Sequence, residues 1–204
     1  MDAKENCPIH GWSENINRPD DGRMKYSVMM CDPPWPTKKG GKRKARPNQD
    51  RELDYPTMSM ADIRILFATQ LLPMMDNQHS LFMWVTERTL NEVETLLTSK
   101  QWTDYKLHCR FIWDKMNGVA PAFTVRFSHE YLLWLYRGKM MPIQKEMRGK
   151  FTTVFREKAR QHSRKPDVAY DMVSALYPNS RKLDAFSREK RDGWDQWGNQ
   201  IDHF

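Results

Sequence analysis

The tetrapeptide Asp32-Pro33-Pro34-Trp35 is the part of the sequence best suited to chemistry. It directly follows the apolar run 26–31, which has the length and composition of a buried strand. Because proline cannot donate to a sheet, the strand must end there, and we expect both proline carbonyls to be free of hydrogen bonds within the chain. A carboxylate and a carbonyl could then hold an exocyclic amine, while the indole offers a flat face for a base. The alternative is a plain proline-rich turn.

The elements that would position this loop alternate along the chain. A helix is predicted after Ser59, which with Asp62 resembles a capping box. A second is predicted along 90–97. A third has Pro166 in its first turn and ends before Pro178. Strands are predicted at 26–31, 80–86, 105–111, 131–136 and 181–186, the last of the chain. This alternation predicts an α/β fold in which a Rossmann-like, doubly wound and mostly parallel sheet carries helices on both faces. Ligands bind such sheets at the carboxyl ends of the strands.

The 204 residues suit one domain, and we expect an irregular N-terminal arm at 1–24 followed by a single domain at 25–204. No apolar run approaches the roughly 20 residues that cross a bilayer. Three cysteines do not make a disulfide framework. Cys7 and His10 have no second Cys/His pair nearby, so we expect no metal site. These features predict a cytoplasmic protein without membrane contact.

The formal net charge of +7 is concentrated in three segments. Residues 38–51, 137–165 and 181–191 carry net charges of +6, +8 and +3, which leaves −10 on the rest of the chain. Clustered Lys and Arg release counterions from phosphates together, so this pattern favours a nucleic acid partner. Solvated surface loops would give the same pattern.

Seven motifs, in order, closely resemble the MT-A70 family of S-adenosylmethionine-dependent adenine N6-methyltransferases over roughly residues 25–202. They are YSVMMCDPPWP, LDYPTMSMADI at 53–63, LFMWVT at 81–86, FIWDKMN at 111–117, SHEYLLWLYRG at 128–138, HSRKP at 162–166 and LDAFSREKRDGWDQWGNQ at 183–200. The resemblance implies a class I methyltransferase fold with permuted motif order, in which the catalytic loop comes first and the cofactor strand last.

The resemblance also implies a role for each matching residue. The catalytic set would be Asp32, Pro33, Pro34 and Trp35. The residues that bind S-adenosyl-L-methionine would be Cys31, Asp32, His162, Ser163, Lys165, Asp184, Phe186, Arg188, Asn199 and Gln200. Nucleic acid would contact Lys38, Lys39, Lys42, Arg43, Lys44, Arg46, Tyr55, Trp113 and Glu130, although a structural role for Glu130 is an equal alternative. A basic active-site loop at 38–51 and a target-recognition insertion at 139–160 complete the expected site.

The implied reaction is methyl transfer to the N6 amine of adenine in nucleic acid. DNA is favoured because the compact chain looks more like the bacterial and phage members, which also suggests the cytoplasm of a bacterial or phage-infected cell. Methylation of RNA, methylation of cytosine N4, and a non-catalytic nucleic-acid-binding subunit remain alternatives. The sequence leaves open whether the chain works alone or as a homodimer or heterodimer.

Overall fold

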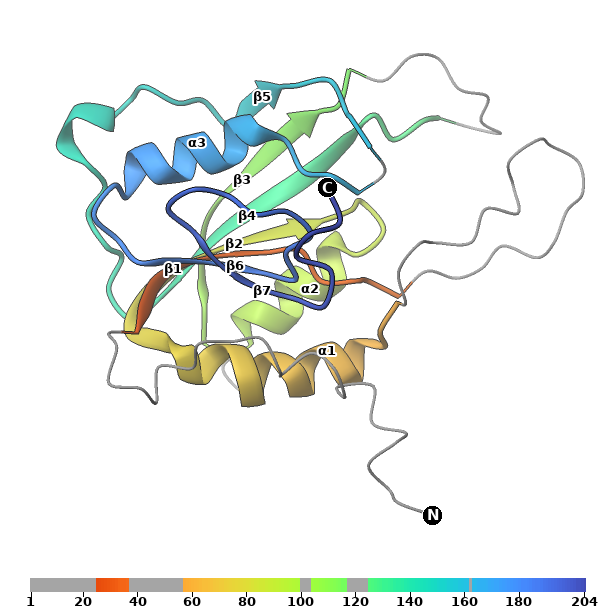
Figure 1. Cartoon of the computed structure of the whole chain (residues 1–204), viewed down its shortest axis with the longest axis horizontal. Coiled ribbons are helices and arrows are strands. Elements are labelled where there is room, and N and C mark those ends of the chain that lie inside the picture. The colour runs from red at the N-terminus through yellow and green to blue at the C-terminus, as the bar shows by residue number, and fades with distance from the viewer. Residues whose placement is uncertain (1–24, 37–56, 100–103, 117–124, 162) are drawn as a thin grey trace, which may run out of the picture.

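One seven-stranded sheet organises the protein (Figure 1). The computed structural model describes residues 25–36, 57–99, 104–116, 125–161 and 163–204. The strand order is β5-β3-β4-β2-β1-β6-β7, and among these strands β4 alone runs antiparallel to its neighbours. The strands are β1 (Tyr26–Cys31), β2 (Met75–Val85), β3 (Lys106–Asp114), β4 (His129–Arg137), β5 (Val154–Arg156), β6 (Lys182–Ala185) and β7 (Asp195–Trp197). The predicted mostly parallel α/β sheet is confirmed.

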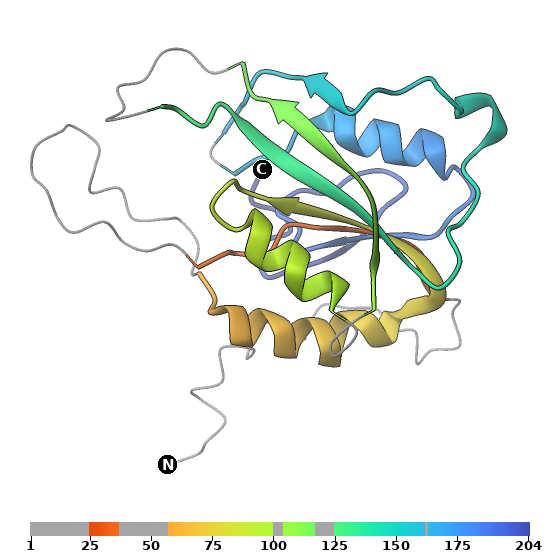
Figure 2. The same ribbon diagram turned by 180° about the vertical axis from the view of Figure 1, so that it is seen from behind.

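Helices cover both faces of the sheet, as predicted. The helix α1 (Met60–Leu66) continues through a π-helical turn, Phe67–Leu71, and a 3-10 turn, Leu72–Met74. It shares one face with α2 (Leu90–Thr98), and α3 (Asp167–Leu176) covers the other (Figures 1 and 2). A further 3-10 turn lies at Lys145–Met147.

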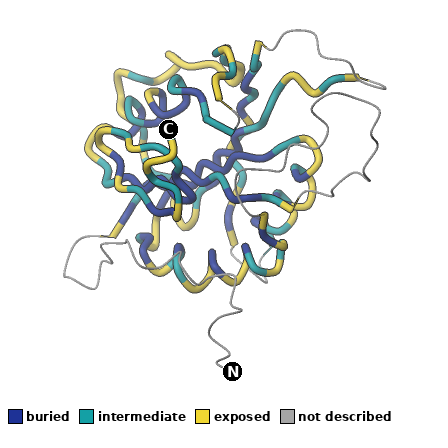
Figure 3. The backbone as a smooth tube through the Cα atoms, turned by 45° about the vertical axis from the view of Figure 1, so that its right-hand side comes forward, coloured by how far each residue is buried: buried dark blue, intermediate teal, exposed yellow. Residues whose placement is uncertain are grey.

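The strand β1 lies at the centre of the sheet and is buried on both sides. Met29 and Cys31 belong to the hydrophobic cluster under α1 and α2, whereas Val28 and Met30 belong to the cluster under α3. Successive strand residues point to opposite faces, so a strand covered on both faces must be apolar throughout. Figure 3 shows this buried centre within an exposed outer layer. The apolar run before Asp32 therefore places that residue at the edge of the core.

Some helix and strand boundaries agree with the prediction, and others differ from it. Ser59 caps α1, since its Oγ accepts the Asp62 N–H at 3.1 Å. Pro166 occupies the N-cap of α3, one position before the first turn where it was predicted. The strand β2 begins at Met75, five residues before the predicted start. The prediction missed these residues because the first half of the strand is polar. The predicted last strand is followed by β7, and β5 and β7 were missed because three residues are too few for a periodic pattern.

Two of the predicted segments, the arm at 1–24 and the basic loop at 38–51, lie outside the described residues. The segment 139–160 contributes β5 and packs Met140, Met141 and Ile143 against the cluster under α3. Its role in target recognition stays a prediction. Among the described helices, none has both the length and the apolar composition needed to cross a membrane.

Gly198 allows the end of β7 to pass close to the loop that follows β6. Ser187 donates its backbone N–H to the Trp197 carbonyl at 3.0 Å. A Cβ at position 198 would lie 2.6 Å from the Ser187 carbonyl oxygen and 3.0 Å from its nitrogen. Real Cβ atoms do not approach backbone this closely, so any larger residue must push the two segments apart.

We expect Gly198→Ala to lower the free energy of unfolding by about 1–3 kcal/mol, the usual cost of overpacking a tight contact. Urea denaturation of the variant measures this. Asp192→Ala, at an exposed position in the preceding turn, is the matched control and should unfold like the parent chain. Equal stability of the two variants would contradict the assigned contact.

Candidate active site

The carboxyl ends of β1, β3 and β6 meet at one edge of the sheet, and the charged groups of the site gather there. Asp32 follows β1, Lys115 follows β3, and Asp184 lies near the end of β6. Because β4 is antiparallel, its first residues lie at the same edge, which brings Glu130 to the group. Lys165 arrives from the turn before α3.

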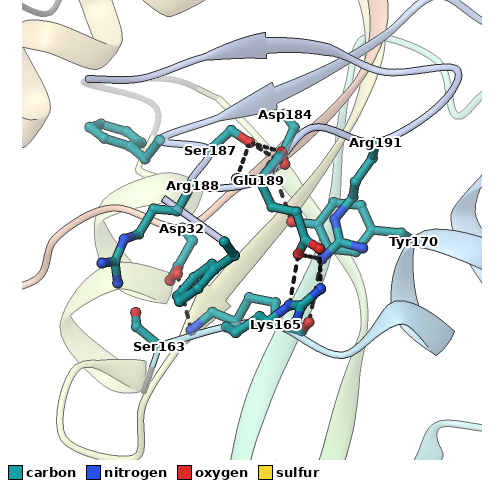
Figure 4. A pocket seen from close by; sticks show the side chains of 12 residues that line it. Asp32, Ser163, Lys165, Tyr170, Asp184, Ser187, Arg188, Glu189 and Arg191 are labelled. Atoms are coloured by element: carbon teal, nitrogen blue, oxygen red, sulfur yellow. Dashed lines mark hydrogen bonds and ion pairs between the residues drawn. The ribbon is translucent and has the colours of Figure 1, made fainter. Parts of the chain in front are cut away.

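A pocket opens to solvent at this edge (Figure 4). Its walls come from the loop after β1, the turn before α3, α3 itself, the end of β6 with the following loop, and the C-terminal segment. The lining residues are Asp32, Ser163, Arg164, Lys165, Tyr170, Asp184, Phe186, Ser187, Arg188, Glu189, Arg191 and Phe204.

The ammonium group of Lys165 lies between two carboxylates. Its Nζ is 3.1 Å from Asp32 Oδ2 and 2.9 Å from Glu130 Oε2. The Trp84 ring centroid is 5.5 Å away, a cation–π distance. The side chain of Lys165 is 11% exposed, so nearly all of its hydration has been replaced by these partners. The other oxygen of Glu130, Oε1, is 2.5 Å from Lys115 Nζ.

These contacts set the charge state of the three groups. Burial raises the pKa of Asp32 to about 6, against the opposing effect of the Lys165 ammonium, while Glu130 adds to the rise. Burial also acts to raise the pKa of Glu130, but Lys165 and Lys115 outweigh it and lower that pKa to about 2. Burial would lower the pKa of Lys165, yet the two carboxylates raise it. Near neutral pH the site therefore holds one cation between two carboxylates.

The Asp-Pro-Pro-Trp loop is fixed by three hydrogen bonds to neighbouring backbone and by one within the loop. Asp32 donates its N–H to the Ala185 carbonyl at 3.2 Å, and the Trp35 indole donates to the Trp84 carbonyl at 3.0 Å. Both proline carbonyls also accept hydrogen bonds: Pro33 from the Trp35 N–H at 2.8 Å, and Pro34 from the Met58 N–H at 2.9 Å. The expectation that these carbonyls are free is wrong, because the turn closes on itself and packs against 57–59. Each oxygen keeps one lone pair for a ligand.

Asp184 forms the acidic wall on the other side of the pocket. Its carboxylate accepts hydrogen bonds from Ser187 Oγ at 2.9 Å and from the Tyr170 hydroxyl at 3.2 Å. Only 3% of the residue is exposed, and burial raises its pKa to about 7. The chain turns sharply after β6, with Phe186 in the left-handed region at φ 62°. A non-glycine residue in that region is uncommon and often marks a functional turn.

Ion pairs tie the rim of the pocket together. Glu189 pairs with Arg164 and lies 2.7 Å from Arg191, which also pairs with Asp167 at 2.5 Å. The guanidinium of Arg191 stacks 3.9 Å above the Tyr170 ring. None of these residues was among the predicted site residues, and the density of charge at 137–165 and 181–191 was the available signal for Arg164, Glu189 and Arg191.

Phe204 closes another side of the pocket. Its ring lies 4.8 Å from the Arg188 guanidinium and 5.7 Å from that of Arg164. The Arg188 carbonyl accepts the N–H groups of His203 and Phe204, which holds the segment in place. Nothing in the sequence pattern pointed to this residue.

The structure brings half of the described predicted site residues together at the pocket. Asp32, Ser163, Lys165, Asp184, Phe186 and Arg188 all line the pocket, and Glu130 reaches it through Lys165. The predicted residues that lie outside the described part of the chain are Lys38, Lys39, Lys42, Arg43, Lys44, Arg46, Tyr55 and His162.

Besides Glu130 and the loop residues Pro33, Pro34 and Trp35, four further predicted residues do not line the pocket. Cys31 points into the cluster under α1 and α2. Trp113 packs in the cluster under α3 and donates its indole N–H to the Glu157 carbonyl at 2.8 Å. Asn199 and Gln200 follow Gly198, just after the end of β7. The functional roles assigned to these four residues stay predictions.

The fold and the site together define a class of protein. An open α/β sheet with carboxylates at the carboxyl ends of two adjacent strands, around a pocket at that edge, is the arrangement of Rossmann-like enzymes that bind a nucleoside-containing cofactor. The MT-A70 family model matches residues 26–200, which is most of the chain. The chain therefore belongs to the MT-A70 family of methyltransferases.

Individual relatives differ mainly in length. A type II methyltransferase, M.MunI, from Mycoplasma sp is 27% identical over 98% of this chain and 87% of its own length. A putative N(6)-adenosine-methyltransferase MT-A70-like from Medicago truncatula is 30% identical over 96% of this chain. The N(6)-adenosine-methyltransferase catalytic subunit METTL3 from Homo sapiens is 29% identical over 87% of it. The chain spans only 29% and 28% of these two longer relatives.

Lys165→Met should destabilise the fold more at pH 8 than at pH 5. Removing one member of a buried ion pair costs roughly 3 kcal/mol, because the remaining charge stays buried. The raised pKa of Asp32, about 6, means that this carboxyl is largely neutral at pH 5 and needs the cation less. Urea denaturation at both pH values measures the difference, with the exposed Lys158→Met as control. An equal loss at both would contradict this charge assignment.

Proposed function

We propose that this chain transfers a methyl group from S-adenosyl-L-methionine to the N6 amine of adenine in DNA. The observation that carries the proposal is the position of Asp32. Its carboxylate follows a buried central strand, lines the pocket and is held by the ammonium of Lys165 at 3.1 Å. An acidic group fixed in this way can accept a hydrogen bond from an amine and hold its nitrogen in one place.

The chemical groups in the pocket fit the proposed cofactor. Its amino group and ribose hydroxyls require acceptors, and Asp32 and Asp184 supply carboxylates. Its carboxylate requires a cation, and Lys165 and Arg188 line the same pocket. The flat rings of Phe186 and Phe204 are suited to pack on adenine. Asp184 already accepts two hydrogen bonds, so a ribose hydroxyl would use its remaining lone pairs.

The protein's contribution to the reaction is positioning and electrostatics. When bound, S-adenosyl-L-methionine supplies an electrophilic methyl group, which the adenine amine accepts with loss of one proton. Asp32 and the carbonyls of Pro33 and Pro34 would orient the amine, because the ion pair to Lys165 holds the carboxylate and backbone hydrogen bonds hold the two carbonyls. Trp35, held through its indole nitrogen, would flank the base. Asp32 needs to be a carboxylate for this task but not a strong base.

The choice of DNA rests on the similarity to the type II methyltransferase M.MunI, which extends over 98% of this chain. The chain matches 87% of the type II methyltransferase and less than a third of the longer N(6)-adenosine-methyltransferases. In duplex DNA the adenine must leave the base stack before it can reach Asp32, at a cost of a few kcal/mol. Clustered cations next to the catalytic loop in sequence would offset part of that cost through phosphate contacts.

Asp32→Asn should abolish methyl transfer while the fold remains intact. The amide keeps the shape of the side chain but loses the negative charge that pairs with Lys165. Incorporation of a labelled methyl group into matched DNA and RNA substrates measures the effect, and the parent chain should modify DNA faster. Asp171→Asn, an exposed position on α3, is the control and should retain full activity. Near-normal turnover by the Asp32 variant would refute the assignment.

Neutralising Lys42, Arg43, Lys44 and Arg46 with Gln should weaken DNA binding and flatten its salt dependence. Each phosphate that the variant no longer neutralises makes the slope of log K against log salt shallower by about 0.9. Binding isotherms at several salt concentrations measure the slope. A variant that exchanges Lys and Arg at the same four positions keeps the charge and should keep the slope. An unchanged slope in the Gln variant would show that these residues do not bind phosphate.

A further inference from the structure

The charged groups at the site form a continuous chain that extends beyond the proposed catalytic loop. Lys115 Nζ is 2.5 Å from Glu130 Oε1, Glu130 Oε2 is 2.9 Å from Lys165 Nζ, and Lys165 Nζ is 3.1 Å from Asp32 Oδ2. The four charges alternate in sign, and each side chain is at most 21% exposed. Asp32 follows β1, Lys115 follows β3, Glu130 lies on β4 and Lys165 precedes α3. Four separate parts of the fold therefore meet in this series of ion pairs.

The geometry makes Glu130 unsuitable as a proton donor or acceptor. Each of its oxygens is engaged by an ammonium group, and the same two cations hold its pKa at about 2 despite burial. It therefore remains a carboxylate near neutral pH. What it can do is compete with Asp32 for the single cation that they share.

We propose that Lys115 and Glu130 are positioning residues that act in opposite directions through Lys165 to set how firmly Asp32 is held as a carboxylate. The inference rests on the proposed function of Asp32. Glu130 draws the Lys165 ammonium away from Asp32, and Lys115 limits that pull by neutralising the far oxygen of Glu130. Lys115 thereby influences Asp32 although two ion pairs separate them.

Other charged or titratable groups also face Asp32, and they stay constant in the test. Cys31 precedes it on β1, Asp184 lies on the adjacent β6, and Arg188 follows that strand. Tyr170 faces it from α3. None of these four is altered by a substitution at Lys115 or Glu130, so changes in Asp32 can be assigned to the ion-pair chain.

Lys115 and Glu130 should shift the titration midpoint of Asp32 in opposite directions. In Lys115→Met, Glu130 takes a larger share of Lys165, so the titration midpoint of Asp32 rises by about half to one pH unit. In Glu130→Gln, Lys165 serves Asp32 alone and the midpoint falls by a similar amount. The midpoint of the double variant should return close to the parent value, because it lacks both the charge of Glu130 that attracts Lys165 and the charge of Lys115 that weakens this attraction. A merely structural role would not give opposite shifts.

Carbon-13 NMR of labelled aspartate carboxyls measures the midpoint without requiring activity, with Asp32→Asn to assign the resonance. The acid limb of the pH–rate profile for methyl transfer should move in the same directions. Lys150→Met and Glu92→Gln, both at exposed positions, are the matched controls and should leave the midpoint unchanged. Lys115→Arg keeps the charge and should preserve most of the parent midpoint.

Opposite shifts with recovery in the double variant support the proposal. Shifts in the same direction, or no shift in either folded variant, overturn it. If Glu130→Gln does not fold, Lys115→Met and Lys115→Arg still decide, because only the first should raise the midpoint. If the NMR midpoints move as expected but no form of the protein methylates nucleic acid, the proposed function fails while the electrostatic coupling stands.

Discussion

The burial of one ammonium group between two carboxylates constrains the whole catalytic edge. Removing a lysine side chain from water is costly, and the cost is offset only where opposite charges approach within hydrogen-bond distance. Lys165 meets that condition through Asp32 and Glu130 together. Because the partners come from different strands, the end of β1, the start of β4 and the turn before α3 must all be in register for the site to exist.

The sheet topology explains how this meeting is achieved. The antiparallel β4 brings its first residues, including Glu130, to the edge where its parallel neighbours end. The start of α3 is fixed from the same side, since the Glu157 carboxylate accepts the N–H groups of Asp167 and Val168 at 3.1 and 2.9 Å. Capping of this kind stabilises a helix by about 1 kcal/mol. Asp167 is only two residues after Lys165, so the cap also fixes the backbone next to the lysine. Lys165 is thus positioned both by its ion pairs and by the capped start of α3.

The sequence was sufficient for the parts of the fold that have a strong local signal. The apolar run before Asp32, the Ser59 cap and the motif order predicted β1, α1 and the α/β class correctly. The strands β5 and β7 have three residues each and owe their conformation to neighbouring strands, which no local pattern records. The hydrogen bond of the Pro34 carbonyl likewise depends on Met58, which is distant in sequence.

The same distinction holds for the site. Asp32, Lys165 and Asp184 were identified from motifs, but Lys115 and Phe204 became recognisable only when the fold brought them to the pocket edge. Their partners lie many residues away along the chain, and a lysine or phenylalanine alone carries no specific signal. Charge density marked the general region without identifying the contacts.

The identity of the methylated base tests the account most directly. Purified protein would be incubated with DNA and S-adenosyl-L-methionine carrying a deuterated methyl group, and the digested nucleosides would be analysed by mass spectrometry. The account predicts that the label appears on adenine N6, and that it is absent when Asp32→Asn is used. Label on cytosine N4, or label on adenine that is unaffected by the Asp32 substitution, would contradict it.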